Sequence, residues 1–134
     1  MVSMRCGLVI LADRHANMLE GIRLMLEAVA ESVLMVADEV SLMQAVERTI
    51  PDLVVADLSF PVSGAGNVVR LIRKHHPDIR VIIMSVHDER TVVNEVMDAG
   101  ADGFVLKRRA AIDLLPAINE VCLGQRFVSP DVEI

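Results

Sequence analysis

The sequence predicts a doubly wound α/β domain, a (βα)5 arrangement with a five-stranded parallel sheet. Two observations predict it: five short apolar runs recur along the chain, and stretches with helical spacing lie between them. The runs lack strict alternation and are rich in β-branched residues, which is typical of strands covered on both faces. The predicted strands are residues 8–12, 33–37, 53–56, 81–84 and 103–106.

Apolar residues at helical spacing predict the crossover helices between these strands. The clearest sets are Met18, Ile22, Met25, Leu26 and Val29, and then Val92, Val93, Val96 and Met97. Ser41 followed by Gln44 predicts a capping box at the start of the second helix, and Asp88 is the expected cap of the fourth. Right-handed crossovers then favour the flavodoxin-like strand order 2-1-3-4-5.

The length indicates one compact domain. At 134 residues the chain can bury a real core but is too short for a catalytic domain plus a substrate domain. We expect the domain to span residues 1–124, and residues 125–134 to form a C-terminal tail or the start of a linker.

Composition excludes several classes of function. The chain has no Trp or Tyr, which argues against an aromatic-lined ligand pocket, and its formal charge of −6 argues against direct nucleic-acid binding. Cys6 and Cys122 have no short-spaced partner, so the sequence predicts reduced packing residues and neither a zinc motif nor a disulfide framework. The N-terminus shows no signal peptide and no membrane span, so a cytoplasmic location without membrane contact is expected.

Polar residues follow the predicted strands at the point where each strand ends. Asp13 and Arg14 follow the first strand, Asp57 the third, Ser85 the fourth and Lys107 the fifth. Because parallel strands end on one edge of the sheet, these side chains should converge. Two carboxylates, a hydroxyl and an ammonium together form a set suited to handling a phosphoryl group.

Four segments resemble the receiver domains of bacterial two-component response regulators. Residues 51–61 (PDLVVADLSFP) resemble the phosphoacceptor segment, and residues 11–15, 83–85 and 100–107 resemble the acidic corner, the switch hydroxyl and the lysine segment. Ser85 and Lys107 follow Asp57 by 28 and 50 residues, as is usual in the family. Residues 117–130 are similar to the LuxR-type branch, in which the receiver precedes a helix-turn-helix DNA-binding domain.

The resemblance implies a role for each matching residue. Asp57 would accept a phosphoryl group from a sensor histidine kinase, with Ser85 and Lys107 contacting its oxygens. Asp13, Asp57 and the backbone carbonyl of Ser59 would hold Mg²⁺, and Phe104 would be the aromatic switch residue that swings inward as Ser85 moves. The output would be a conformational change rather than a released product, so the domain is expected to be a signalling module and not an enzyme.

The same resemblance implies the partners. Besides the kinase, it implies a homodimer formed through the fourth and fifth helices. DNA would be contacted only through a C-terminal domain outside this chain, which would make the whole protein a transcription regulator.

Arg14 departs from the family pattern, because a second acid usually stands there. Its guanidinium could pair with Asp57 in place of the cation, clamp an incoming phosphoryl group, or point to solvent. The missing acid would weaken the Mg²⁺ site or remove it. If Arg14 fills the cation position, the alternative function is a pseudo-receiver, a protein-interaction or dimerisation module that does not depend on phosphorylation.

Two enzyme classes fit less well. An aspartate-nucleophile phosphohydrolase would want a second acid two residues after Asp57, where Ser59 stands. A flavin or nucleotide binder would want a glycine-rich turn after the first strand, where residues 13–17 contain no glycine.

Overall fold

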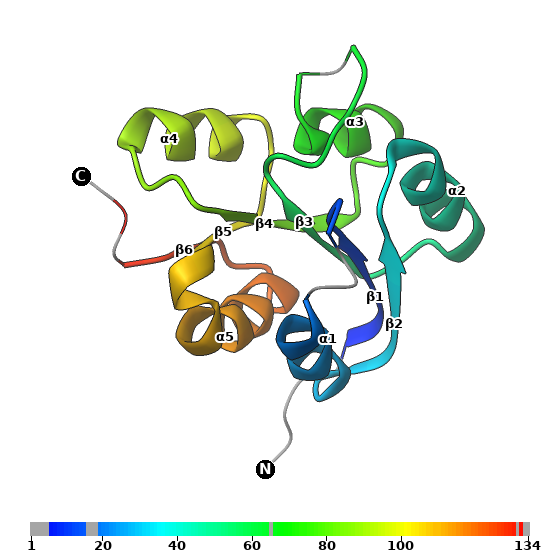
Figure 1. The fold of residues 1–134 in the computed structure, drawn as a ribbon, viewed down its shortest axis with the longest axis horizontal. Coiled ribbons are helices and arrows are strands. Elements are labelled where there is room, and N and C mark those ends of the chain that lie inside the picture. The colour runs from blue at the N-terminus through cyan, green and yellow to red at the C-terminus, as the bar shows by residue number, and fades with distance from the viewer. Residues whose placement is uncertain (1–5, 16–18, 65, 131, 133–134) are drawn as a thin grey trace.

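The computed structural model describes residues 6–15, 19–64, 66–130 and 132. The chain alternates strands and helices, and a short 3-10 turn leads into the last helix (Figure 1). The elements are β1 (Cys6–Ala12), α1 (Glu20–Glu27), β2 (Ala30–Val36), α2 (Glu39–Thr49), β3 (Leu53–Asp57), α3 (Val68–His75), β4 (Arg80–Ser85), α4 (Arg90–Asp98), β5 (Gly103–Leu106), η2 (Lys107–Arg109), α5 (Ala110–Cys122) and β6 (Phe127–Val128).

The sheet is parallel and has the order β2-β1-β3-β4-β5-β6. The predicted order of the first five strands is confirmed, but the prediction of five strands is wrong by one. β6 has only two residues, too few for any hydrophobic period, and it is held by backbone hydrogen bonds from Phe127 N to Asp102 O (3.1 Å) and from Ser129 N to Phe104 O (2.9 Å).

The segment after α5 therefore extends the sheet. Ser129 is only 2% exposed, accepts a hydrogen bond from Leu106 N at 3.0 Å and donates one to Asp113 Oδ2 at 2.8 Å. Asp113 also accepts from Arg109 Nε at 2.8 Å. The hydrogen bond from Arg109 holds the pKa of Asp113 below its usual value; burial opposes this effect, and Ser129 adds to it. Residues 127–129 are thus fastened to β5 and α5.

The helices cover the sheet in two layers (Figure 1). α2, α3 and α4 bury apolar side chains on one face, among them Leu42, Ile72 and Val96. α1 and α5 cover the other face, with Leu26 and Leu114 fully buried. Because both faces are covered, all five residues of β3 and all four of β5 are buried, which explains why those strands read as continuous apolar runs.

Helix starts differ from the predicted caps. The side chain of Asp38, not Ser41, caps α2 by accepting a hydrogen bond from Ser41 N at 2.8 Å. Glu89 stands at the N-cap of α4, while Asp88 pairs with Arg108 at 3.2 Å. Met18, predicted on the first helix, lies outside the described residues.

The two cysteines also depart from expectation. Cys6 opens β1 and Cys122 closes α5, and their sulfur atoms lie 2.6 Å apart. The sequence carries no sign of this contact, because 116 residues separate the two cysteines and only the fold brings them together.

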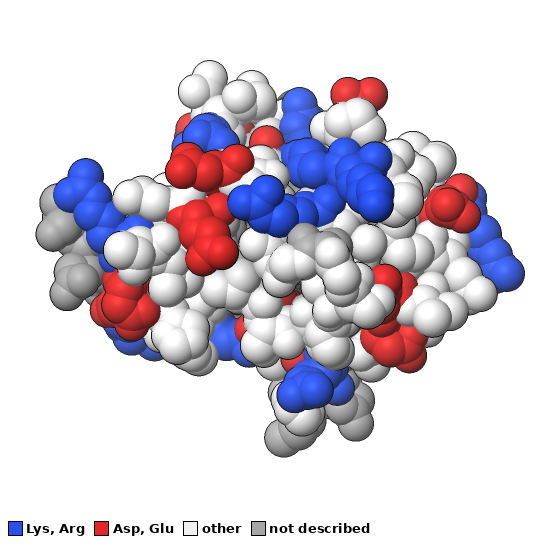
Figure 2. Space-filling model, turned by 90° about the horizontal axis from the view of Figure 1, so that it is seen from above, with Lys and Arg blue, Asp and Glu red and all other residues white. Residues whose placement is uncertain are grey.

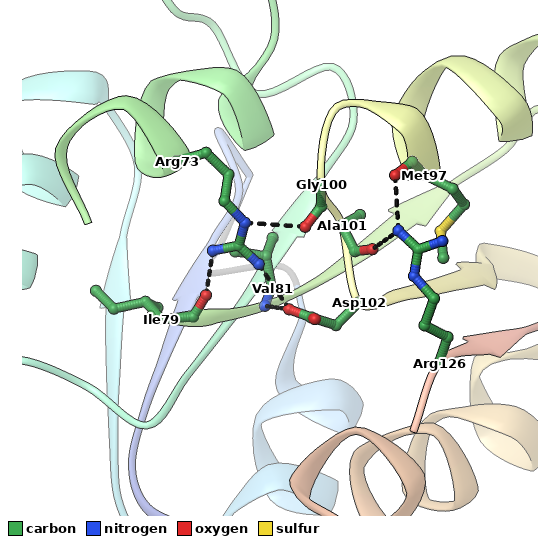
Figure 3. Close-up of polar contacts among 8 residues, drawn as sticks. All are labelled: Arg73, Ile79, Val81, Met97, Gly100, Ala101, Asp102 and Arg126. Atoms are coloured by element: carbon green, nitrogen blue, oxygen red, sulfur yellow. Dashed lines mark hydrogen bonds and ion pairs between the residues drawn. The ribbon is translucent and has the colours of Figure 1, made fainter. Parts of the chain in front are cut away.

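At the end of the sheet where the strands begin, Arg73 of α3 joins three segments (Figure 3). Its guanidinium donates hydrogen bonds to Gly100 O at 2.9 Å, to Asp102 Oδ2 at 2.7 Å and to Ile79 O. The same oxygen of Asp102 also accepts a hydrogen bond from Val81 N at 2.9 Å. Gly100 has φ +113°, and a Cβ there would lie 3.1 Å from the Arg73 side chain. Glycine is therefore favoured at this position by its backbone conformation, and any larger residue would also crowd the Arg73 side chain.

A second arginine fastens the chain after α5 to the end of α4. Arg126 Nη2 donates to Met97 O at 2.9 Å and to Ala101 O at 3.3 Å (Figure 3). Carbonyls at a helix C-terminus lack intrahelical partners, so Arg126 acts as a C-terminal cap supplied from a distant segment.

Figure 2 shows the molecule from above, over α3 and α4: basic side chains gather over α3, and acidic side chains lie over α4. α3 carries Arg70, Arg73 and Lys74, and α4 carries Glu95 and Asp98. The mixed signs give this face no broad basic surface of the kind that nucleic-acid binding requires.

Replacing Arg73 by Met should destabilise the domain by about 2 kcal/mol, because three carbonyl or carboxylate acceptors lose a partly buried donor. Urea unfolding followed by circular dichroism measures this. Arg70→Met, on the exposed side of the same helix, is the matched control and should cost less than about 0.5 kcal/mol. Equal losses in the two variants would contradict the role assigned to Arg73.

Candidate functional site

The predicted site residues meet at the edge where the strands end. β1, β3, β4 and β5 are consecutive neighbours in the sheet, so the residues that close or follow them lie side by side. Asp13 follows β1, Asp57 closes β3, Ser85 closes β4 and Lys107 follows β5. The structure thus brings together four of the residues that the sequence singled out.

Lys107 lies between the two carboxylates. Its Nζ is 2.8 Å from Asp57 Oδ1 and 3.5 Å from Asp13 Oδ2. Asp13 is 1% exposed and Asp57 is 5% exposed, so both carboxylates are largely desolvated. Two buried carboxylates repel each other and are costly without a counterion, which the ammonium group supplies.

Burial works to lower the pKa of Lys107, but the hydrogen bond and charge of Asp57, together with Asp13, outweigh it and raise the pKa above its usual value. A raised pKa in the folded state means that this stabilisation is complete below the pKa of an unfolded lysine, about 10.4. It is lost only as the pH rises through the higher pKa of the folded state. The ammonium is therefore charged at every pH near neutrality.

The other oxygen of Asp57 is engaged from its own loop. Oδ2 accepts a hydrogen bond from Ser59 N at 3.2 Å and another from the Ser59 hydroxyl. The sequence predicts a role only for the backbone carbonyl of Ser59, so this hydroxyl is a site group that was not anticipated. The signal for it is the spacing, because a residue two positions after a strand-terminal Asp can turn back onto its carboxylate.

A pocket of about 270 Å³ opens beside Asp57. Ser85 lies in its wall, is 1% exposed, and accepts a hydrogen bond from His87 N at 2.9 Å. The residues that line the pocket are Asp57, Leu58, Ser59, Ser85, Val86, His87 and Lys107. A carboxylate, a hydroxyl and an ammonium thus share one small cavity.

Arg14 does not fill the cation position. Its side chain is exposed and forms neither a hydrogen bond nor an ion pair with Asp57, whose charge is met by Lys107. Of the three interpretations left open by the sequence, the structure contradicts the pairing with Asp57 and shows the side chain exposed to solvent. The pseudo-receiver alternative loses the observation on which it rested.

Phe104 lies in the interior. It is 0% exposed and belongs to the apolar cluster beneath α2, α3 and α4. The inward position that the sequence analysis expected to follow a movement of Ser85 is already the position of the ring in this structure.

The acidic pair fits a divalent cation in one respect. Asp13 Oδ2 is buried and, apart from the 3.5 Å ion pair with Lys107 Nζ, has no hydrogen-bond partner among the described residues, while Asp13 Oδ1 accepts a hydrogen bond from His15 N at 2.8 Å. A buried carboxylate oxygen with a free lone pair suits a hard cation. Within the described ranges there is no group of three or more His, Cys, Asp or Glu side chains able to hold a metal, so the carboxylate ligands would be Asp13 and Asp57 alone.

A comparison with protein families decides the assignment. The family described as response regulator receiver domain matches residues 9–119, most of the chain. The chain belongs to this family. Among the helices that the structure describes, none is long and apolar enough to cross a membrane.

Curated relatives place this receiver among LuxR-type regulators. The chain is 33% identical over 127 residues to the response regulator UvrY of Escherichia coli K12, covering 92% of this chain and 58% of UvrY. It is 29% identical over 126 residues to the transcriptional regulatory protein DegU of Brevibacillus brevis, covering 92% of this chain and 53% of DegU. The receiver therefore spans a little over half the length of these relatives.

Solved receiver structures agree with the fold. The non-phosphorylated receiver of RcsB from Escherichia coli superposes with a TM-score of 0.82 at 27% identity, covering 96% of this chain and 99% of that one. The isolated RcsB receiver from Salmonella enterica with the phosphomimetic BeF3⁻ gives 0.80 at 27% identity, covering 98% and 96%. A LuxR-family regulator from Aurantimonas gives 0.84 at 30% identity, covering 96% and 92%.

Replacing Lys107 by Met should destabilise the receiver by about 1–2 kcal/mol near neutral pH, because Asp57 loses its counterion while it stays buried. Thermal unfolding monitored by circular dichroism measures the loss. Lys74→Met, at an exposed position on α3, is the control and should change stability little. A Lys107→Met domain as stable as the original would show that the ammonium contributes nothing to holding the carboxylates.

Proposed function

We propose that Asp57 accepts a phosphoryl group from a sensor histidine kinase and that the resulting acyl phosphate changes the conformation of the domain. The observation that carries this proposal is the shared pocket, where the Asp57 carboxylate lies 2.8 Å from Lys107 Nζ and beside the buried hydroxyl of Ser85. An oxygen of Asp57 would attack phosphorus, the phosphorus–nitrogen bond to the kinase histidine would break, and the imidazole would leave with the electron pair.

Each neighbour has a chemical task in this step. Lys107 would neutralise charge on the transferred group, exchanging part of its contact with the carboxylate for one with a phosphoryl oxygen. The hydroxyl of Ser85 would donate to another phosphoryl oxygen. That new hydrogen bond would draw Ser85 toward Asp57 and alter its present contact with His87 N, so the loop after β4 is the first segment to respond.

Asp13, Asp57 and the backbone carbonyl of Ser59 are the proposed ligands of Mg²⁺, which would supply positive charge for phosphoryl oxygens. The buried Oδ2 of Asp13, whose one cationic neighbour among the described residues is Lys107 Nζ at 3.5 Å, supports this assignment. Because Arg14 replaces the second acid, the affinity should be lower than a three-carboxylate site would give.

The whole protein's output is proposed from its relatives. DegU is a transcriptional regulatory protein, and RcsB forms dimers that bind DNA. We infer a helix-turn-helix output domain attached beyond this chain, contact with DNA only through that domain, homodimerisation, and action in the cytoplasm, where DNA and the kinase domain meet. Residues 1–124 with the strand that follows them would be the receiver.

Treatment with acetyl phosphate and Mg²⁺ should add about 80 Da to the intact protein, the mass of one phosphoryl group. The adduct should be absent in Asp57→Asn and present in Asp78→Asn, which removes one exposed carboxylate elsewhere. Intact-mass spectrometry under mild acid, where acyl phosphates survive, gives the readout. Folded protein without an adduct, or an adduct that persists in Asp57→Asn, would refute the proposed phosphoacceptor.

Arg14→Asp should tighten Mg²⁺ binding about tenfold, because it removes a positive charge and adds a carboxylate next to Asp13. Isothermal titration calorimetry is the suitable measurement, since the chain has no Trp or Tyr to report by fluorescence. Arg48→Asp makes the same charge change in the last turn of α2, away from the strand ends, and should leave the affinity nearly unchanged. Equal effects of the two substitutions would mean that only net charge matters.

A further inference from the structure

The contact between Cys6 and Cys122 lies outside the phosphoryl site and has no role in it. Cys6 is the first residue of β1 and Cys122 the last of α5, so the pair sits where β1 begins, whereas Asp13 follows the other end of that strand. At the rise of an extended strand, the two ends of β1 are roughly 20 Å apart. The thiols therefore form a separate chemical site.

Regular structure fixes the position of both sulfurs. Cys6 is 4% exposed, and its backbone N donates to Val29 O at 2.8 Å. Cys122 packs against the same apolar cluster, in which the neighbouring turn of α5 contributes Ile118 and Val121. Both cysteines are free thiols, and their Sγ atoms lie 2.6 Å apart. Disulfide formation thus needs only a small adjustment of side chains, because the backbone already brings the two residues together.

The two thiols differ in reactivity. Cys122 is partly exposed, so a small oxidant can reach the end of α5. Burial raises the pKa of Cys6 to about 12, with the contact to Cys122 adding to the effect, so Cys6 is a poor first target for an oxidant. This asymmetry assigns the first reaction to Cys122 and the second to Cys6.

We propose that Cys6 and Cys122 form a redox modification site, at which a peroxide converts the two thiols into an intramolecular disulfide. In the first step Cys122 takes one oxygen from hydrogen peroxide, giving a sulfenic acid and releasing water. In the second step Cys6 Sγ attacks Cys122 Sγ, the sulfur–oxygen bond breaks, and the hydroxide leaves as water with the proton of Cys6. Over the two steps the two thiols together lose two electrons to form the disulfide, and one molecule of hydrogen peroxide takes up these electrons and becomes water.

Proximity makes the second step feasible despite the low acidity of Cys6. The sulfurs are held together before oxidation, so the attack is intramolecular and needs no diffusive encounter. The disulfide closes a loop that contains most of the chain, joining the start of β1 to the end of α5. It should therefore stabilise the folded domain while leaving the distant Asp57 pocket open.

The test is exposure of the folded receiver to hydrogen peroxide in stoichiometric amounts, followed by intact-mass spectrometry after denaturation and alkylation with N-ethylmaleimide. The expected product is about 2 Da lighter than the reduced protein and takes up no maleimide, whereas the reduced protein takes up two. A non-reducing peptide digest should contain one cross-linked pair carrying both cysteines. The Tm should rise by about 5 °C and return on treatment with a reducing agent.

Cys6→Ser and Cys122→Ser are the matched controls. Each should still fold, and neither should show the 2 Da loss or the rise in Tm. In Cys6→Ser the sulfenic acid at Cys122 has no resolving thiol, so a second equivalent of hydrogen peroxide, itself reduced to water, should convert it into a sulfinic acid about 32 Da heavier than the reduced protein. The proposal is overturned if the folded parent protein keeps two alkylatable thiols, if Cys122 over-oxidises in it as in Cys6→Ser, or if the disulfide forms between two molecules.

Discussion

The ammonium group of Lys107, which lies between the buried carboxylates of Asp13 and Asp57, sets the arrangement of the edge where the strands end. Parallel strands end together, so the topology places Asp13 beside Asp57 whatever the energetic cost of two like charges. Lys107 offsets that cost by lying 2.8 Å from one carboxylate and 3.5 Å from the other. Because Lys107 begins η2 directly after β5, its place depends on the pairing of β4 with β5, and so on the whole sheet.

The opposite end of the sheet has a different chemistry. There the Arg73 guanidinium donates charge-assisted hydrogen bonds to backbone carbonyls and to Asp102, and the two cysteines meet without a charged partner between them. Charged and polar groups at the Asp57 end line an open pocket, whereas Arg73 at the other end fastens segments together. The sheet thus separates signal reception from structural support by the length of its strands.

The sequence was sufficient to predict those parts of the fold that are decided by short-range hydrophobic patterns. The five apolar runs correctly predict the first five of the six strands and their order, and Asp13, Asp57, Ser85 and Lys107 do meet at the ends of these strands. It failed where the deciding contact is distant in sequence or has no period. β6 is only two residues long, and the contact between the two thiols spans 116 residues of sequence. Asp38 and Ser41 are both good capping residues, and the structure has Asp38, whose backbone is extended, at the N-cap of α2. Arg14 had three chemically reasonable positions in the sequence, and the pairing of Lys107 with Asp57 decides against one of them, a pairing of Arg14 with Asp57.

The Arg73 cluster also bears on the order in which the domain folds. Its acceptors come from the turn before β4 and from the loop between α4 and β5, so the cluster is complete only after three separate segments have docked. We expect an interaction that needs three docked segments to form late in folding and to be weak in the folding transition state. Its loss should then raise the unfolding rate more than it lowers the folding rate. On this view the lifetime of the folded receiver, more than the time taken to fold, would depend on the Arg73 guanidinium.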